Sequence, residues 1–334
     1  MRVAIIGSGL QCRRRAPVVV ESQADTLVAI ASLHRDHAEA IASKMGCEAT
    51  DDWRSTVTRD DVDVVVVCTP PYVHAEIGVA ALEAGKHVLC EKPMTRSVAD
   101  AERLVAAADR ADRVLKCGFN HRHHPAVWEA RRLVEKGTIG KPLFARCVYG
   151  ICGRPGYEDE WRADPDRAAG GQFIEQGTHA IDLFRWFLGE LVDVACMTGT
   201  QYFKDQPLED NGMAMFRSAG GAMASLHTSL TQWKNAFSFE IFGEDGYLGV
   251  EGLGASYGTE RLIAGRRDFQ APFQDTITEY RGGDISWREE WKEFMRAIVE
   301  RREPIGSGRD GLAAMRVARA AYGAEESRTY ARVG

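Results

Sequence analysis

The sequence lacks a long hydrophobic run and paired cysteines, and each absence excludes a class of protein. No apolar stretch reaches the roughly 18 residues of a membrane span. "MRVAIIG" starts a strand at once, which leaves no room for a signal peptide. The eight cysteines form no CxxC pair, and several fall inside apolar runs, as small buried thiols do. We therefore expect a cytoplasmic protein in a reducing compartment.

An excess of positive charge is also missing. With 42 Lys and Arg against 48 Asp and Glu, the formal net charge is −6 and the pI is about 5.9. Nothing therefore attracts the chain in bulk to nucleic acid or to anionic membranes. Internal repeats, heptads and low-complexity segments are absent as well. What is present, 334 residues with 45% hydrophobic and 27% charged, is typical of a globular protein of two domains.

The first 120 residues alternate between short apolar runs and segments with helical spacing of apolar residues. Because the run Val64 to Val67 has no polar alternation, it is typical of a parallel strand that helices cover on both faces. Ser97 followed by Asp100 predicts a capping box at the start of a helix, and Gly85 a left-handed cap at the end of another. The pattern predicts a βαβ series with strands at 2–7, 26–31, 62–68, 86–91 and 113–119.

The sequence pattern changes after about residue 120. A helix is expected over 126–136, ending near Gly137, and then several segments alternate with period two between glycine-rich turns such as "AGG" and "EDG". These segments predict a mainly antiparallel sheet. Helical patterns follow in "GTHAIDLFRWFLG", "WREEWKEFMRAIVE" and "GLAAMRVARAAYGAEES". We expect an α/β protein with domains at 1–120 and 121–334.

The first strand ends in "GSGLQC", residues 7–12, the start of a GxGxxG loop whose third glycine is replaced by Cys12. Gly7 permits a tight turn and Gly9 a close approach to a pyrophosphate at the positive end of the following helix. A glycine turn without a ligand is the alternative. The other strand ends favour the ligand, because binding in open α/β sheets occurs along the carboxyl edge.

Three further strand ends carry polar groups. The second strand ends in "ASLHRD", where Ser32 and Arg35 stand in place of the acidic residue that holds the ribose of NAD, and a hydroxyl with a guanidinium favours NADP over NAD. The third ends in "CTPPYVH", with Thr69, Pro70, Pro71 and His74, and the fourth in "CEKP".

Together, "GSGLQC", "CTPPYVH", "AGKHVLCEKP" and "GGQFIEQGTHAID" resemble the Gfo/Idh/MocA family of NAD(P)-dependent sugar and cyclitol oxidoreductases over nearly the whole chain. The resemblance implies a Rossmann domain followed by an α+β domain with a large, mostly antiparallel open sheet. It also implies homodimers or homotetramers through that sheet, and a position for Lys92 beside the nicotinamide and the substrate hydroxyl.

Lys92 has a chemical reason to be there. Removing hydride from a secondary alcohol leaves a developing carbonyl oxygen, which an ammonium stabilises. Glu91 is expected to touch the nicotinamide ribose or to orient Lys92, and Pro93 to fix the turn.

The segment 170–189 supplies a second constellation. Glu175, His179 and Asp182 fall at i, i+4 and i+7 on one helical face, and a histidine between acids suits proton transfer. The apolar neighbours of His179 also permit a packed core residue. By resemblance His179 matches the family's acid/base histidine, and Glu175 replaces the usual aspartate.

Other candidate site residues belong to weaker sequence patterns. Trp161 and Arg162 resemble a pair that contacts cofactor in some members, and a lid residue with a surface cation is the alternative. His121, His123 and His124 are too close in sequence to converge on one metal, so we expect none. The cofactor-binding set that we expect is Gly7, Ser8, Gly9, Leu10, Ser32, Arg35, Thr69, Pro70, Pro71, His74, Glu91, Lys92, Asn120, Trp161 and Arg162. The substrate-binding set is Lys92, Arg122, Glu175, His179, Asn235 and Tyr257, of which Lys92, His179 and Glu175 are the catalytic candidates.

The expected function is hydride transfer between the nicotinamide of NADP or NAD and a secondary alcohol or ketone carbon of a sugar, sugar derivative or cyclitol. One alternative is an NAD-dependent cycle of oxidation, elimination and reduction with net glycoside hydrolysis. Another is an inactive NAD(P)-binding sensor, although a dead site has no need of both Lys92 and His179.

Overall fold

The computed structural model describes residues 1–270 and 273–334, which divide into two compact units. The first unit contains Met1–Asn120 and Trp287–Met315, and the second contains His121–Ser286 and Arg316–Gly334. Between Trp287 and Met315 the chain returns to the first unit after it has built most of the second. The domain bounds 1–120 and 121–334 stay a prediction.

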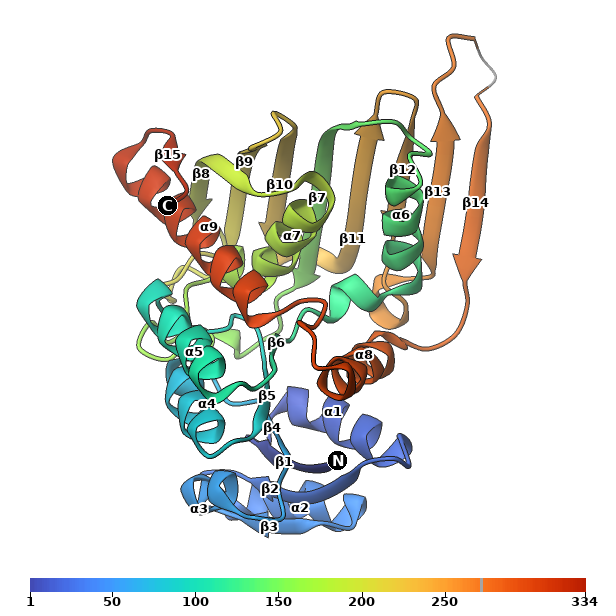
Figure 1. Cartoon of the computed structure of the whole chain (residues 1–334). Helices are drawn as coiled ribbons and strands as arrows, with labels where there is room; N and C mark the ends of the chain where they lie inside the picture. The colour runs from blue at the N-terminus through green and yellow to red at the C-terminus, as the bar shows by residue number, and fades with distance from the viewer. Residues whose placement is uncertain (271–272) are drawn as a thin grey trace. The chain divides into compact units, whose positions relative to one another are not determined.

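The first unit is built on a six-stranded sheet in the order β3-β2-β1-β4-β5-β6, with every neighbouring pair parallel (Figure 1). The four residues of β4 are all buried, as their unbroken apolar run predicts. The short strand β3 extends the sheet at one edge. Its polar and small residues, "EAT", did not predict a strand. The strands are β1 (Arg2–Ile6), β2 (Thr26–Ala31), β3 (Glu48–Thr50), β4 (Val64–Val67), β5 (His87–Cys90) and β6 (Leu115–Cys117).

Helices connect these strands in the alternating order that the sequence predicts. The Ser97 side chain accepts a hydrogen bond from the Asp100 amide at 3.1 Å, and Gly85 has φ +77° beyond the end of α4, so both expected caps are present. The helices are α1 (Leu10–Glu21), α2 (Arg35–Met45), α3 (Trp53–Thr58), η1 (Pro71–Val73), α4 (His74–Glu83), α5 (Val98–Ala111) and α8 (Ser286–Glu300), with the first part of α9 (Gly308–Ser327).

The second unit is built on a nine-stranded sheet in the order β14-β13-β12-β11-β7-β10-β9-β8-β15. Only the pair β7 and β10 is parallel among the paired strands of the described residues, which confirms a mostly antiparallel sheet. The strands are β7 (Pro142–Cys152), β8 (Leu191–Gly199), β9 (Asn211–Ser218), β10 (Met223–Ser229), β11 (Thr231–Gly243), β12 (Gly246–Glu251), β13 (Glu260–Arg266), β14 (Asp275–Tyr280) and β15 (Ala331–Arg332).

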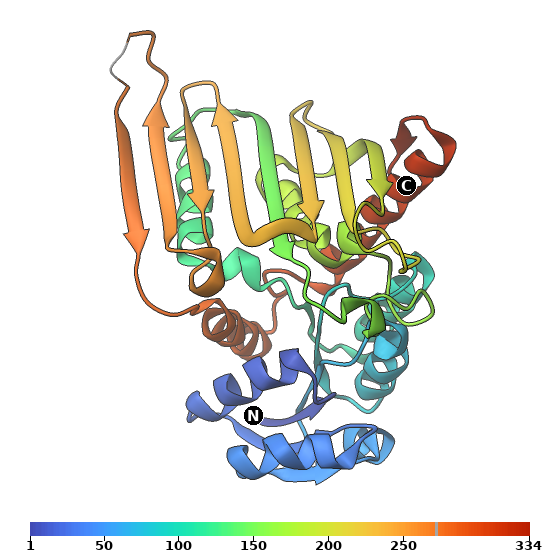
Figure 2. The same cartoon turned by 180° about the vertical axis from the view of Figure 1, so that it is seen from behind.

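In the part of the chain that the structure describes, helices cover one face of this sheet. In Figure 1, α6 (Pro125–Glu135) and α7 (Gln172–Leu188) lie in front of the strands, and Figure 2 shows the opposite face without helices. The strand β9 alternates strictly, with Ala214 and Phe216 buried and Met213 and Met215 exposed. The short helices η2 (Asn120–His123), η3 (Tyr157–Asp159) and η4 (Ala255–Tyr257) complete the regular elements.

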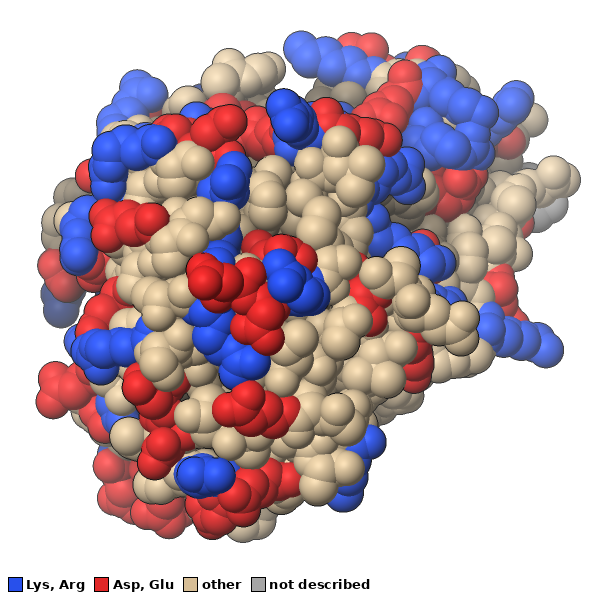
Figure 3. Space-filling view, turned by 60° about the horizontal axis from the view of Figure 1, so that its bottom comes forward, with Lys and Arg blue, Asp and Glu red and all other residues tan. Residues whose placement is uncertain are grey.

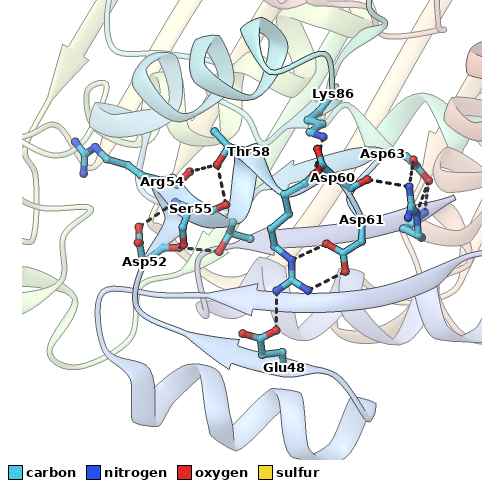
Figure 4. Close-up of polar contacts among 12 residues, drawn as sticks. Glu48, Asp52, Arg54, Ser55, Thr58, Asp60, Asp61, Asp63 and Lys86 are labelled. Carbon is cyan, nitrogen blue, oxygen red and sulfur yellow. Dashed lines mark hydrogen bonds and ion pairs between the residues drawn. The ribbon is translucent and has the colours of Figure 1, made fainter.

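The amino ends of strands β4 to β6 carry charges that neutralise one another. Arg59 forms ion pairs with Asp61 at 2.7 Å and with Glu48 at 2.6 Å, and Lys86 donates to the Arg59 carbonyl (Figure 4). A cavity of about 890 Å³ opens at this edge, and among its cations Arg309 pairs with Asp109 and Arg302 with Glu293. Ligands of open α/β sheets bind at the other edge, so this cavity is not the expected cofactor site.

The charges of the surface are mixed. Basic and acidic side chains are interspersed on the face shown in Figure 3, in keeping with the small net charge. Among the helices of the described residues, none is both long and apolar enough to span a bilayer.

Candidate active site

The two glycines of the first loop have different structural surroundings. Gly7 has φ +106°, and a Cβ added there would lie 2.7 Å from the Cys68 carbonyl carbon, so the turn itself requires glycine. Gly9 has φ −75°, and an added Cβ would meet no atom within 4 Å. Gly7 therefore serves the chain's own packing, whereas Gly9 faces open space.

The helix that starts at Gly9 has an uncompensated amino terminus. No side chain caps α1, and no acidic residue stands in its first turn. The amide groups and the positive end of the helix dipole are thus available to an anion. Cys12, in the place of the third glycine, is buried in the core, and burial raises its thiol pKa to about 12. The loop fits a dinucleotide pyrophosphate, with Ser8 and Leu10 flanking Gly9.

The end of β2 adjoins this loop. The Ser32 and Ser8 hydroxyl oxygens are 2.7 Å apart, so these two predicted residues share a hydrogen bond. Arg35 lies at the start of α2, where it forms an exposed ion pair with Glu39 at 3.0 Å. Exposed pairs of this kind contribute little free energy, so the guanidinium can exchange Glu39 for another anion.

His74 ties two strand ends together. Its Nε2 is 2.7 Å from the Thr69 carbonyl oxygen after β4, and its Nδ1 is 3.2 Å from the Met94 carbonyl oxygen after β5. The ring is buried, and burial is the main cause that lowers its pKa. The imidazole therefore links the backbone just before Pro70 and Pro71 to the backbone just after the Glu-Lys-Pro turn. Its contact with a cofactor stays a prediction.

Glu91, the first residue of the Glu-Lys-Pro turn, is held by a buried arginine. Arg15 of α1 donates from Nε to Glu91 at 2.5 Å and lies 2.9 Å from Glu290 of α8. Burial alone would lower the pKa of Arg15, but Glu91 and Glu290 outweigh it and raise the pKa above its ordinary value. Of the two roles expected for Glu91, this contact supports orienting Lys92, whose side chain is buried next to it.

The ion cluster continues toward β6. The Lys116 ammonium lies 3.7 Å from Glu290 and 3.8 Å from Glu293, all buried, and the Arg15 guanidinium carbon lies 4.8 Å from the Trp287 ring centroid. We call Arg15, Glu91, Lys116, Glu290 and Glu293 the Arg15 cluster. It shows that the returning helix α8 completes the first unit.

Sequence reasoning missed the Arg15 cluster, although a signal for it exists. Arg15 occupies the buried stripe of α1 with Cys12, Ala16 and Val19, a spacing at which an apolar residue is expected. Glu290 stands likewise between the buried Trp287 and Trp291 of α8. Two opposite charges in two apolar stripes predict a buried pair.

In the second unit, α7 carries the predicted residues Glu175, His179 and Asp182, and each of them has different partners. Arg122 donates to both oxygens of Asp182, at 2.7 and 2.6 Å, and both side chains are buried. The arginine also lies over the Trp186 ring at 5.2 Å. This pair fastens η2 to α7, and a contact of Arg122 with substrate stays a prediction.

His179 is part of a buried aromatic cluster. Its ring stacks on His121 with centroids 3.7 Å apart and an interplanar angle of 23°. His121 Nε2 lies 3.0 Å from the Tyr149 hydroxyl, and the rings of Tyr149 and Tyr257 meet edge to face at 5.8 Å. The predicted Tyr257 therefore belongs near His179, while Tyr149, inside a strand pattern, gave no sequence signal.

Glu175 contacts a different predicted residue. Its carboxylate lies 3.5 Å from Arg162, which also pairs with Glu160 at 3.2 Å and lies over the Trp161 ring at 4.4 Å. The expected Trp161–Arg162 pair is thus a stacked unit directed at Glu175. Whether it reaches a cofactor stays a prediction.

Two further predicted residues have structural surroundings of their own. Asn235 accepts a hydrogen bond from the Cys152 amide at 3.3 Å and donates to Ser256 at 2.7 Å, which links β11 to β7 and η4. Asn120 is buried at the start of η2. Neither arrangement tests the predicted ligand contacts.

The three clustered histidines diverge to separate partners. His121 faces Tyr149, His124 Nδ1 lies 3.0 Å from Glu260, and His123 stacks on Trp128 at 6.0 Å. Within residues 1–270 and 273–334, no group of three His, Cys, Asp or Glu side chains could hold a metal ion.

Comparison with known proteins decides the family. The profile described as "Oxidoreductase family, NAD-binding Rossmann fold" matches residues 1–119, and the Gfo/Idh/MocA C-terminal domain profile matches residues 127–249. The chain belongs to the Gfo/Idh/MocA family. It is therefore an oxidoreductase, and its first unit is an NAD-binding Rossmann domain. The motifs predicted such a domain for NADP or NAD, and the preference for NADP stays a prediction.

Two relatives and one solved structure illustrate the likeness. Levoglucosan dehydrogenase of Pseudarthrobacter phenanthrenivorans is 32% identical over 66% of this chain and 63% of its own length, just under two thirds. Myo-inositol 2-dehydrogenase of Thermotoga maritima is 28% identical over 94% of this chain and 93% of that protein. A structure of levoglucosan dehydrogenase in complex with NADH superposes with a TM-score of 0.91 at 25% identity, covering 100% of this chain and 99% of the other.

Proposed function

We propose that this protein moves hydride between a nicotinamide cofactor and a secondary alcohol or ketone carbon of a sugar, sugar derivative or cyclitol. The observation that carries the proposal is the match over 94% of the chain to a relative named for a cyclitol dehydrogenase, together with Lys92 and His179 in the motifs that resemble the family. A nicotinamide, when bound, supplies the hydride acceptor or donor. The residues of the chain have to bind the cofactor and the substrate, orient them, and move the proton.

The first unit supplies binding and a permanent cation. Gly9 and the uncapped start of α1 would hold the pyrophosphate, because both the open space and the positive helix end suit it. Lys92 would stabilise the negative charge that develops on the reacting oxygen. Arg15 holds Glu91 at the end of β5 and so limits the positions open to Lys92 next in the chain.

The second unit supplies the titratable group. His179 would accept the hydroxyl proton during alcohol oxidation and return it during ketone reduction. Its buried ring and stacked partner keep it in one orientation. Glu175, drawn toward Arg162, would act in substrate binding rather than as the carrier of the proton.

The test is a panel of sugars, keto-sugars and inositols that includes myo-inositol and levoglucosan, incubated with NAD(H) or NADP(H) and followed by the nicotinamide absorbance at steady state. We expect turnover with at least one polyol and stoichiometric change of the cofactor. Net hydrolysis of a glycoside without net cofactor turnover would instead support the elimination cycle. Cofactor binding without turnover of any panel member would support the inactive sensor.

The preference for NADP over NAD is the finer part of the cofactor proposal. Ser32, hydrogen-bonded to Ser8, offers a hydroxyl at the end of β2, and Arg35 is available a few residues later. A 2′-phosphate would find a donor and a cation there, with no carboxylate before Asp36 to repel it.

The same proposal includes a homo-oligomer formed through the uncovered sheet face of the second unit. Met213 pairs in register with Met197 on β8 and with His227 on β10, so the exposed Met197 and Met213 lie side by side. Met213, Met215 and Met223 are 51%, 57% and 58% exposed, an unusual loss of apolar burial unless a second copy covers them. The cytoplasmic location expected from the free cysteines belongs to this proposal too.

Light scattering after size-exclusion chromatography tests the oligomer. We expect a dimer or tetramer for the wild-type chain and dissociation when Met213→Asp and Met215→Asp are combined, since two carboxylates on the face oppose its burial. Val299→Asp, at an exposed position of α8 in the first unit, is the control. A monomeric wild-type chain at micromolar concentration contradicts the proposal.

A further inference from the structure

The stack of His121 on His179 brings two imidazoles closer than two charged rings could stay. The centroids are 3.7 Å apart, and the residues are only 5% and 4% exposed. Because like charges in a buried site repel strongly, at most one of the two rings is protonated at a time. The proton that His179 exchanges in the proposed function therefore depends on the state of His121.

Tyr149 is a polar partner of His121. Its hydroxyl lies 3.0 Å from His121 Nε2, and its own ring is held edge to face by Phe237 at 5.4 Å. A phenol is a good donor to an unprotonated imidazole nitrogen, and such a donation leaves the His121 proton on Nδ1. This arrangement suits a neutral His121, in which Nε2 carries no proton and accepts from the hydroxyl.

The charged groups next to the stack pair with one another. On its own element, Arg122 is neutralised by Asp182 of α7. His124, whose ring meets His121 at 5.6 Å, is bound by Glu260 of β13. From α7 itself, Glu175 lies one turn before His179 and pairs with Arg162.

We propose that His121, held neutral by Tyr149, is a positioning residue that presents an uncharged aromatic face to His179 and stabilises the imidazolium formed there when the substrate proton is accepted. The proposal rests on the proposed role of His179. A cation against an aromatic face is favourable, and more so where water is excluded. His121 touches no reacting atom in this scheme and acts only through His179.

Three variants test it with the holoenzyme and the panel substrate, myo-inositol or levoglucosan, that is turned over fastest. Tyr149→Phe removes one hydroxyl and keeps the ring, and we expect kcat to fall about three- to tenfold with unchanged cofactor Kd, the range that one hydrogen bond supplies. His121→Leu removes the aromatic face. We expect its low-pH limb for alcohol oxidation to move down by about half to one and a half pH units, since the charged form of His179 loses a favourable contact.

His121→Phe is the conservative rescue. It restores an uncharged ring, so we expect its low-pH limb to return close to the wild-type position and its kcat to exceed that of His121→Leu. Tyr330→Phe, at an exposed tyrosine, is the matched control for the loss of a hydroxyl. Melting temperatures separate packing from positioning.

The outcomes distinguish this inference from the proposal beneath it. If His179→Ala keeps the wild-type rate and pH dependence, the proposed function of His179 fails. If His179→Ala is inactive while Tyr149→Phe and both His121 variants keep the wild-type rates and limbs, only the role of His121 is overturned. A lowered melting temperature with unchanged pH profiles has the same meaning, because it assigns the cluster to packing alone.

Discussion

The two units of the chain hold their candidate residues with different chemistry. In the first, Glu91 forms an ion pair with Arg15 in the Arg15 cluster, whose other members, from β6 and α8, are acidic and basic side chains. In the second, His179 stacks on the ring of His121, which contacts the Tyr149 hydroxyl. Lys92 is in the first environment and His179 in the second.

The difference suits the two proposed tasks. A group that stabilises developing charge works best as a permanent cation fixed by other permanent charges. A group that exchanges protons must change its charge without disturbing its neighbours, and rings allow that better than ion pairs do. Each prediction below alters one side of this comparison.

The largest effects are expected at Lys92 and His179. Lys92→Met and His179→Ala should each lower kcat by about 10²- to 10⁴-fold, the usual cost of losing a positioned cation or an acid/base. Only His179→Ala should also lose one limb of the pH–rate profile, because only the imidazole titrates there. Steady-state kinetics over pH 5 to 10 measure both.

Two controls keep this comparison interpretable. Both variants should bind cofactor as the wild type does in a fluorescence titration, which separates chemistry from binding. Glu175→Gln should lose less activity than either, because Glu175 pairs with Arg162 instead of carrying the proton. A His179→Ala enzyme with both pH limbs would show that titration occurs elsewhere.

The next effect is on stability. Arg15→Met leaves Glu91 and Glu290 buried without their shared cation, and we expect the free energy of unfolding to fall by about 3 to 5 kcal/mol. Arg13→Met, two residues earlier on the exposed side of α1, should change it little. Urea unfolding measures both. A small effect at Arg15 would mean that Lys116 alone neutralises the cluster.

The two units also differ in how much of their structure could be predicted from the sequence. The parallel strands and their ends follow from unbroken apolar runs and glycine turns, so the fold class and the edge that carries Gly9, Ser32 and Lys92 were predictable. The family motifs also located His179. The partners of these residues were not predictable, because Arg15 is 76 positions from Glu91 and α8 returns to the first unit from the far end of the chain.

Contacts that arise only from folding were missed for a physical reason. Tyr149 looks like any inward residue of an alternating strand, and its approach to His121 depends on the position of β7 beneath α7. The three-residue strand β3 has too few apolar residues to show a period. Local patterns report which face is buried, but not which polar groups meet there.

The two loop glycines should separate fold from ligand. Gly7→Ala forces a side chain into φ +106° against the Cys68 backbone, and we expect a loss of about 1 to 3 kcal/mol in stability. Gly9→Ala meets no atom, so its melting temperature should stay near that of the wild type while NAD affinity falls about tenfold or more. Thermal melts with and without NAD measure both effects. If Gly9→Ala binds NAD with unchanged affinity, the pyrophosphate does not bind at this loop.

The smallest effect concerns the choice of cofactor. Ser32→Asp places a carboxylate at the end of β2, where it would repel a 2′-phosphate charge of about −2 and accept ribose hydroxyls instead. We expect the ratio of NADP to NAD affinity to fall by about tenfold, which is one ordinary charge contact. Glu39→Gln is the opposing variant, because it frees Arg35 from its exposed partner and should raise NADP affinity slightly. Dissociation constants for both dinucleotides decide the matter: if the wild type binds NAD at least as tightly as NADP, or if Ser32→Asp leaves the ratio unchanged, the end of β2 does not read the 2′-phosphate and Arg35 serves only its helix.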